Sequence, residues 1–165
     1  MQLVLERITE QDEPFLYDVY ASTREEELAV VPWGAAEREA FLRMQFDAQH
    51  RYYRQAFGKA EFSKILVDGV AAGRLYVDRR PSEIRIIDIA LLPAFRGRGI
   101  GTQLLSSLIA EAEARGVPVR IHVERQNRAR SLYQRLGFTR SGGDEIYELM
   151  ECPPSSRAGG VESDR

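Results

Sequence analysis

The chain has 165 residues, enough for one domain that buries about 70% of the surface its unfolded chain would expose. A net charge of −2 gives no basic footprint for nucleic acid, and a single cysteine excludes a disulfide framework or a multi-cysteine metal site. No apolar run approaches the roughly 20 residues that span a bilayer, and residues 1–7 mix charged with apolar side chains, unlike a secretory signal. We expect a cytoplasmic protein that binds neither membrane nor nucleic acid.

The N-terminal part of the chain predicts one strand followed by two helices. Residues 2–9 alternate apolar and polar side chains, as a half-buried strand does. Thr9 is placed to cap the next helix, with Asp12 three residues later in a loose capping-box pattern. Residues 21–34 are predicted as a loop or short helix, and residues 35–57 as a second long helix. Five of its residues are expected to face inward: Phe41, Leu42, Met44, Phe46 and Tyr53.

The middle of the chain predicts three strands and a helix. Residues 62–67 and 70–78 are joined by Asp68-Gly69, a dipeptide that tolerates positive φ and therefore indicates a tight hairpin. Residues 84–92 are apolar and β-branched, which is typical of a strand buried on both faces. The next helix, up to residue 115, has an apolar face with 3.6-residue spacing, formed by Ile100, Leu104, Leu105, Leu108, Ile109 and Ala112.

The C-terminal part predicts a strand at 117–123, a short helix at 127–136 and a last strand at 146–150. Asn127 is a good N-cap for the short helix, and Gly137 stands where a C-terminal glycine belongs. From residue 151 onward the sequence is rich in Pro, Gly and Ser, with one sizeable apolar residue. We therefore expect a domain over residues 1–150 and a disordered tail over 151–165.

A glycine-rich turn, Arg96-Gly97-Arg98-Gly99-Ile100-Gly101, joins the buried strand to its helix. The first backbone N–H groups of a helix lack intrahelical partners and attract anions, and glycines let a phosphate approach the bare backbone. The two arginines add fixed charge with bidentate geometry. No lysine follows the glycines as in a P-loop, and a dinucleotide fingerprint counted from Gly97 would need glycine at Thr102. The spacing that fits is Arg-x-x-Gly-x-Gly.

This loop resembles that of the GNAT N-acetyltransferases, whose pyrophosphate-binding sequence [Q/R]-x-x-G-x-[G/A] follows a hydrophobic strand and binds coenzyme A. A second stretch is similar to the family at matching spacings: Asn127, Ala129, Leu132-Tyr133 and Gly137-Phe138. The resemblance covers about residues 1–150, with its specific motifs in 84–138. It implies an α/β (α+β) fold with a mixed central sheet of six to seven strands and helices on both faces.

The resemblance also implies an acetyl-CoA-dependent N-acetyltransferase acting on an unidentified primary amine, with a homodimer left open. The alternative is a catalytically idle acyl-CoA-binding module with a regulatory or scaffolding role. Retention of Tyr133 and of the intact loop favours the enzyme. The residues expected to contact coenzyme A are Leu91, Leu92, Arg96, Gly97, Arg98, Gly99, Ile100, Gly101, Thr102 and Asn127.

Acetyl transfer requires a stabilised oxyanion, a protonated leaving thiolate and a deprotonated amine. The resemblance assigns the oxyanion to a backbone N–H near Leu91 and Leu92, and preorganised donors of this kind are usually the largest catalytic term. Tyr133 is the candidate acid, since a phenol with a pKa near about 10 keeps its proton at neutral pH. The competing interpretation is that Tyr133 packs in the core beside Leu132 and Leu136.

His122 is the first candidate base, because a group that titrates near about pH 7 suits an alkyl amine with a pKa of about 10.4. Some members of the family carry a catalytic Glu at the matching place, and this chain departs from them by carrying His. A histidine that merely fills a sheet face is an equal alternative. Asp88 is expected either to orient His122 or hold the amine, or to be a buried, paired carboxylate. Glu124 is ranked lower because it is expected to face away from His122, and a water chain with no dedicated base stays open.

By analogy with the family, the acceptor pocket involves residues 21–34 and the second helix. Residues Glu25, Glu26 and Glu27 are candidates to attract a cationic amine, although a charge run is usually a solvated face. Four aromatic residues are candidates for the pocket wall, with core packing as the alternative: Trp33, His50, Tyr52 and Tyr53.

Overall fold

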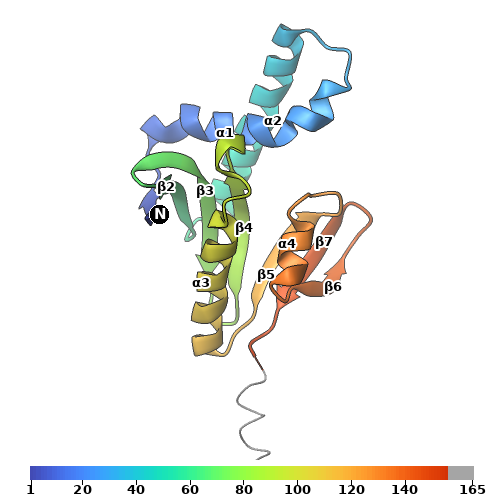
Figure 1. Ribbon diagram of the computed structural model, residues 1–165. Helices are drawn as coiled ribbons and strands as arrows, with labels where there is room; N and C mark the ends of the chain where they lie inside the picture. Colours follow the sequence, from blue (N-terminus) through green and yellow to red (C-terminus); the bar gives the residue numbers. More distant parts are fainter. Residues whose placement is uncertain (156–165) are drawn as a thin grey trace, which may run out of the picture. The chain divides into compact units, whose positions relative to one another are not determined.

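The computed structural model describes residues 1–155 and divides the chain into two compact units (Figure 1). The first unit comprises Met1–Asp78 and Ile87–Ile100, and the second comprises Arg79–Ile86 and the chain from Gly101 onward. Strand β4 (Ile84–Leu91) contributes its first half to the second unit and its second half to the first.

In the first unit the strands follow the order β1-β2-β3-β4, with β1 and β3 antiparallel to β2. The hairpin between β2 and β3 turns at Asp68 (φ 49°) and Gly69 (φ 83°), which confirms the predicted tight turn. The N–H of Leu92 donates to the carbonyl of Ala72 at 2.8 Å and ties the end of β4 to β3. The elements of this unit are β1 (Leu3–Arg7), a 3-10 turn (Glu10–Asp12), α1 (Glu13–Ala29), α2 (Ala35–Ala56), β2 (Glu61–Val67), β3 (Val70–Arg79) and a second 3-10 turn (Pro93–Phe95).

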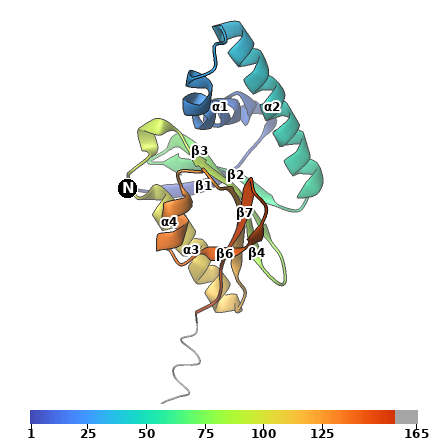
Figure 2. The same ribbon diagram turned by 90° about the vertical axis from the view of Figure 1, so that its right-hand side faces the viewer.

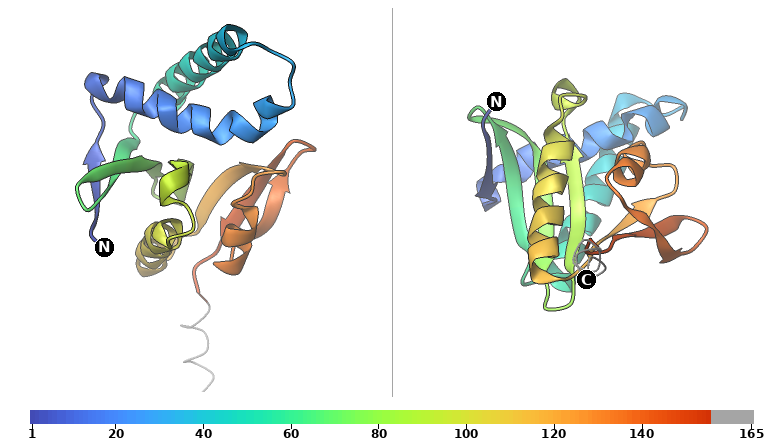
Figure 3. Two further views of the ribbon diagram at one scale, coloured as in Figure 1. Left: turned by 45° about the horizontal axis from the view of Figure 1, so that its top comes forward. Right: turned by 60° about the horizontal axis from the view of Figure 1, so that its bottom comes forward.

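Helix α1 runs to Ala29, so the prediction of a loop or short helix over 21–34 is wrong for its first part. The hydroxyls of Ser22 and Thr23 donate to the carbonyls of Val19 and Tyr20 and stay within the helix. Leu28, near the end of α1, lies in the core between α1 and α2. Figures 2 and 3 show these two helices joined by a short loop. That core contains Leu16, Tyr20, Leu28, Leu42 and Phe46.

Helix α2 matches its predicted extent, but one of its expected inward residues points outward. Leu42 and Phe46 are four residues apart and share the buried face, with 8% and 0% of their surface exposed. Met44 lies between them, about 200° around the helix from each, and is 58% exposed. Its expected inward position is therefore wrong.

In the second unit the strand order is β4-β5-β7-β6. Strand β5 is parallel to β4, with Ile84 opposite Val119 and Ile86 opposite Ile121, and β7 is antiparallel to both β5 and β6. The seven strands form the mixed α/β sheet that the sequence predicts. The elements are α3 (Ile100–Arg115, its first residue in the first unit), β5 (Val119–Glu124), α4 (Arg130–Arg135), β6 (Thr139–Gly143) and β7 (Tyr147–Cys152).

Two differences from the sequence prediction lie at the end of the chain. Strand β6, with the sequence TRSGG, has no large apolar residue, so no alternation marked it in advance. Strand β7 continues two residues past the expected domain end, where Glu151 pairs with Arg120 at 2.7 Å and Cys152 is buried. The predicted tail is therefore strand at 151–152, and its residues 156–165 lie outside the described residues.

Helix α4 begins three residues later than predicted. Asn127 does not cap it; its side-chain carbonyl accepts from the N–H of Ala129 at 2.8 Å and closes a turn before the helix. The predicted glycine end is confirmed. Gly137 has φ 103°, and the N–H of Phe138 donates back to the carbonyl of Tyr133 at 3.0 Å, as in a Schellman motif.

Within residues 1–155, none of the helices combines the length and apolar character needed to cross a membrane.

Replacing Phe46 with alanine should lower the free energy of unfolding by about 3–5 kcal/mol, because the ring is fully buried in the α1–α2 core. Met44→Ala on the same helix is the matched control and should change it by less than about 0.5 kcal/mol, since Met44 is exposed. Urea denaturation of both variants measures the difference. Equal losses would contradict the assignment of the buried face.

Candidate functional site

The loop after β4 is fastened to the first unit by Arg96. Its Nε donates to the carbonyl of Leu91 at 3.0 Å, and its Nη2 lies 3.4 Å from the Ser22 hydroxyl oxygen. Arg96 is half-buried, so its guanidinium links the loop to α1 as well as carrying positive charge beside it. The contacts of Arg96 therefore hold the loop in place against α1.

Two glycines leave the loop backbone open. Gly97 and Gly99 have φ values of 72° and 80°, and a Cβ added at either position would meet no atom within 4 Å. Left-handed backbone with open space around it is the arrangement in which only glycine is unstrained and a ligand can approach the N–H groups. Arg98 is exposed, with its guanidinium 5.4 Å from the centroid of the Phe95 ring. Helix α3 begins at Ile100, directly after Gly99, so the loop ends at a helix N-terminus suited to an anion.

In the second unit, Gly101 lies close to helix α4. A Cβ added there would lie 3.4 Å from Cδ2 of Leu132, so the first turn of α3 and helix α4 approach closely at this point. Thr102 follows on the exposed face of the same turn.

The two backbone groups nominated for the oxyanion are not equivalent. The N–H of Leu92 already donates to Ala72 of β3. Successive residues of a strand direct their N–H groups to opposite edges, so the N–H of Leu91 faces the edge away from β3. Leu91 is therefore the better candidate donor.

Tyr133 lies on α4 and is 2% exposed, with its ring 5.7 Å from that of Phe138. The Schellman bond between the same two residues fixes the end of the helix. The packing role expected as an alternative is therefore present, and it also holds the ring in one direction.

His122 lies on β5 between the buried residues Ile121 and Val123 and is itself exposed. Arg85 Nη1 lies 2.9 Å from its Nδ1. Burial lowers the pKa of His122 below its ordinary value of 6.5, and the charge of Arg85 lowers it further. The expectation that Glu124 faces away from His122 is wrong, because residues two apart in a strand share a face.

Asp88, in the first unit, accepts a hydrogen bond from Arg74 Nη2 across the β3–β4 pair. Arg74 is 3% exposed and also donates to Gln49 Oε1 of α2 at 2.8 Å. A buried guanidinium needs such a counter-ion, so the contact supports the interpretation of Asp88 as a paired structural carboxylate.

Residues that the sequence analysis did not select surround His122. Glu83, just before β4, is 5% exposed and accepts from Arg85 Nε at 3.1 Å and Arg120 Nη1 at 3.0 Å. Burial alone would raise the pKa of the Glu83 carboxyl, but the hydrogen bonds from Arg120 and Arg85 outweigh it and hold the pKa below 4.5. The sequence offered one signal for this ion pair, because Glu83 and Arg85 stand two residues apart at the start of an otherwise apolar strand.

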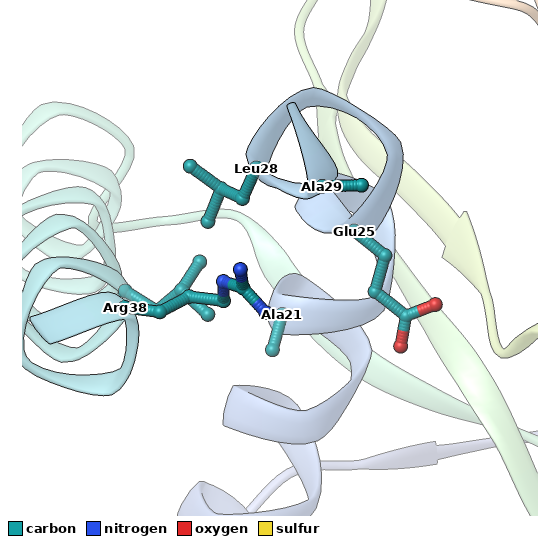
Figure 4. Close-up of a pocket in the computed structure, with 6 residues that line it drawn as sticks. Ala21, Glu25, Leu28, Ala29 and Arg38 are labelled. Atoms are coloured by element: carbon teal, nitrogen blue, oxygen red, sulfur yellow. The ribbon is translucent and has the colours of Figure 1, made fainter. Parts of the chain in front are cut away.

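A hollow of about 380 Å³ lies between α1 and α2 in the first unit (Figure 4). It is lined by Ala21, Glu25, Leu28, Ala29, Arg38 and Leu42. These residues come from the two stretches expected to contribute to an acceptor pocket, residues 21–34 and α2, and Glu25 is among the residues nominated individually. All four nominated aromatic residues pack on other rings: Trp33 on Phe41, His50 on Phe46, Tyr52 on Phe57, and Tyr53 on Tyr76.

The candidate residues thus fall into two sets. Asp88, Leu91, Leu92 and residues 96–100 belong to the first unit. Gly101, Thr102, His122, Asn127 and Tyr133 belong to the second.

A mixed sheet with a glycine loop between its central strand and a helix N-terminus is suited to a ligand that carries phosphate groups. Residues 15–138 match the profile of the acetyltransferase (GNAT) family, and the chain belongs to that family. Its members are acetyl-CoA-dependent N-acyltransferases, with acetyl-CoA as the co-substrate.

The chain is also similar to known proteins, in part of its sequence and in its fold. The chain is 34% identical over 82 residues to a [ribosomal protein bS18]-alanine N-acetyltransferase of Haemophilus influenzae, a match covering 42% of this chain and 56% of that relative. The fold resembles the PaiA N-acetyltransferase from Thermoplasma acidophilum in complex with coenzyme A, with TM-score 0.69, 19% identity, and 93% and 99% of the two chains covered. It also resembles the ribosomal-protein-S18-alanine N-acetyltransferase from Escherichia coli, with TM-score 0.61, 22% identity, and 93% and 95% covered.

Glu83→Gln should lower the free energy of unfolding at pH 7 by roughly 1–3 kcal/mol, the range for hydrogen bonds to a charged group. Because the folded-state pKa of Glu83 lies below 4.5, the wild-type advantage is complete above that pH and is lost as the pH falls through the lower value. Denaturation at several pH values measures the difference in free energy of unfolding between the wild type and Glu83→Gln. Glu111→Gln, in a half-exposed pair with Arg79, is the control and should cost less than about 1 kcal/mol. A gap for Glu83→Gln that widens toward low pH would contradict the assignment.

Proposed function

We propose that the chain transfers an acetyl group from acetyl-CoA to a primary amine by direct attack, without an acetyl-enzyme intermediate. The observation that carries the proposal is the left-handed Gly97 and Gly99 backbone, open to solvent and ending at the start of α3. The two glycines leave backbone N–H groups accessible to the pyrophosphate of coenzyme A. Arg98 adds exposed positive charge on the same loop.

In the proposed reaction the neutral amine nitrogen attacks the thioester carbonyl carbon. The carbonyl oxygen becomes an oxyanion, which accepts a hydrogen bond from the N–H of Leu91. The C–S bond then breaks, the Tyr133 hydroxyl gives its proton to the departing thiolate, and the proton on the amine nitrogen is lost to solvent. Solvent returns a proton to Tyr133, so protons and charge balance.

The acceptor we favour is the α-amino group of a peptide. The support is the curated relative, whose name gives alanine of ribosomal protein bS18 as the residue that is N-acetylated, and alanine has no side-chain amine. An α-amino group has a pKa of about 7.7–8.0, so much of it is neutral near pH 8, whereas a lysine side chain with a pKa of about 10.4 needs more help. A thiol-release assay with acetyl-CoA tests this, comparing peptides that begin with alanine against blocked peptides, free lysine and a polyamine. Coenzyme binding without turnover on any amine would favour the acyl-CoA-binding module instead.

Gly99→Glu should weaken coenzyme A binding by at least about tenfold, because the carboxylate would occupy the phosphate path and repel it. Gly99→Ala separates charge from backbone strain. Like Gly99→Glu it places a side chain at a positive φ, but it adds no charge, so its loss of coenzyme A affinity should be smaller. Gly58→Glu is a further control, since Gly58 lies after α2 and has ordinary space around it. Calorimetry measures all three. Wild-type affinity in Gly99→Glu would refute the phosphate loop.

Tyr133→Phe should reduce turnover by about 10²–10⁴-fold, because it removes the proton donor and keeps the ring. The packing on Phe138 is retained, so the melting temperature and coenzyme A affinity should change little. Tyr147→Phe, a half-exposed tyrosine on β7 of the same unit, is the matched control and should keep full turnover. Full turnover in Tyr133→Phe at every pH would make Tyr133 a packing residue only.

A further inference from the structure

Arg85 contacts two groups in the second unit with one guanidinium. Its Nε donates to Glu83 Oε2 at 3.1 Å, and its Nη1 lies 2.9 Å from Nδ1 of His122. Only 15% of the Arg85 side chain is exposed, and Glu83 is held in turn by Arg120. Because the guanidinium is planar and its N–H directions are fixed, the bond to Glu83 also fixes the direction of the donor that meets His122.

The chemistry of these two side chains determines where the proton on His122 lies. A guanidinium has five N–H donors and no acceptor. Contact at 2.9 Å with an imidazole nitrogen is attractive only when that nitrogen carries a lone pair. Nδ1 is therefore the acceptor, and in the neutral ring the single proton lies on Nε2.

We infer that Arg85, oriented by Glu83, is a positioning residue that holds His122 as the neutral tautomer protonated on Nε2, which makes His122 a hydrogen-bond donor and not the base for the acceptor amine. This deepens the proposed function and, in its kinetic consequence, rests on it. One nitrogen of His122 is engaged by Arg85 and the other carries a proton, so neither offers a lone pair to an ammonium group. His122 instead presents its Nε2–H on the exposed face of β5, where a substrate oxygen is a suitable acceptor.

Protonating His122 would place an imidazolium against a guanidinium. The charged groups that act on the ring are Arg85 and Glu83 at the start of β4, Asp144 in the β6–β7 turn, and Glu124 on the same strand face. Glu83 and Asp144 favour the charged ring, but burial and Arg85 outweigh them. The amine proton must therefore leave by another route, and an α-amino group, much of which is neutral near pH 8, needs no strong base.

Nitrogen-15 NMR of the full-length chain tests the inference without any substrate. The chain has two histidines, so the spectrum of His122→Gln identifies the His122 signals. At pH 7.5 we expect a protonated, pyrrole-like Nε2 and an unprotonated, pyridine-like Nδ1. A ring protonated on Nδ1, or an even mixture of tautomers, would overturn the inference from the wild-type protein alone.

Arg85→Met keeps the aliphatic stem and removes the donor. Its His122 should populate both tautomers and titrate at a higher pH than in the wild type. Arg80→Met is the matched control: Arg80 also reaches Glu83, at 3.5 Å, and its replacement should leave the His122 tautomer unchanged. Identical His122 spectra in Arg85→Met and the wild type would overturn the role of Arg85.

The kinetic arm uses whichever amine the thiol-release assay identifies. We expect kcat/KM of the wild type to show no ionisation belonging to His122, so His122→Gln should change its magnitude but not the shape of its pH profile. Loss of an ionisation near about pH 6.5 in His122→Gln would identify a base and overturn the inference. If no amine is acetylated, the proposed function fails while the NMR result still decides the tautomer.

Discussion

Strand β4 imposes the constraint on which the rest of the fold depends. Its first residues pair with β5 in parallel, and Leu92 at its end donates to β3. Neighbours on both edges leave β4 without a free edge, and Ile84 and Ile86 are buried, with 0% and 1% of their surface exposed. Pro93 then ends the strand, and the left-handed glycines direct the chain into α3 within a few residues. The conformation of the glycine loop is thus a consequence of how the central strand ends.

The second constraint concerns the charged residues in and beside the central strands, which form specific ion pairs. Arg74 is paired with Asp88 in the first unit, and Glu83 accepts from Arg85 and Arg120 in the second. Arg74 is 3% exposed, and leaving a buried charge without its partner costs about 3–5 kcal/mol, so this pair constrains both of its strands strongly. Pairs of this kind explain why an apolar strand carries Arg85 and Asp88 without losing its place in the sheet.

The sequence predicted the elements whose signal is local. Period-2 and period-3.6 patterns placed most strands and helices, and Asp68-Gly69 and Gly137 marked turns that need positive φ. Strand β6 was missed because a polar, glycine-containing strand has no hydrophobic alternation and is specified by its pairing with β7. Met44 was misplaced because it is apolar yet on the wrong side of α2. Such assignments depend on tertiary neighbours that a single segment does not encode.

The same distinction between local and long-range signals applies to the candidate site. The glycine loop could be predicted, because the conformation and the chemistry come from one short stretch of chain. The role of His122 could not, because it depends on a contact with Arg85, 37 residues away in sequence. Residue type alone allows histidine to be a base, a donor or a packing group. The group bound to one ring nitrogen decides what the other can do, and an arginine at Nδ1 leaves Nε2 with a proton to donate. A histidine on a sheet face therefore acquires its chemical role from the register of the strands, since that register sets which cation meets its ring.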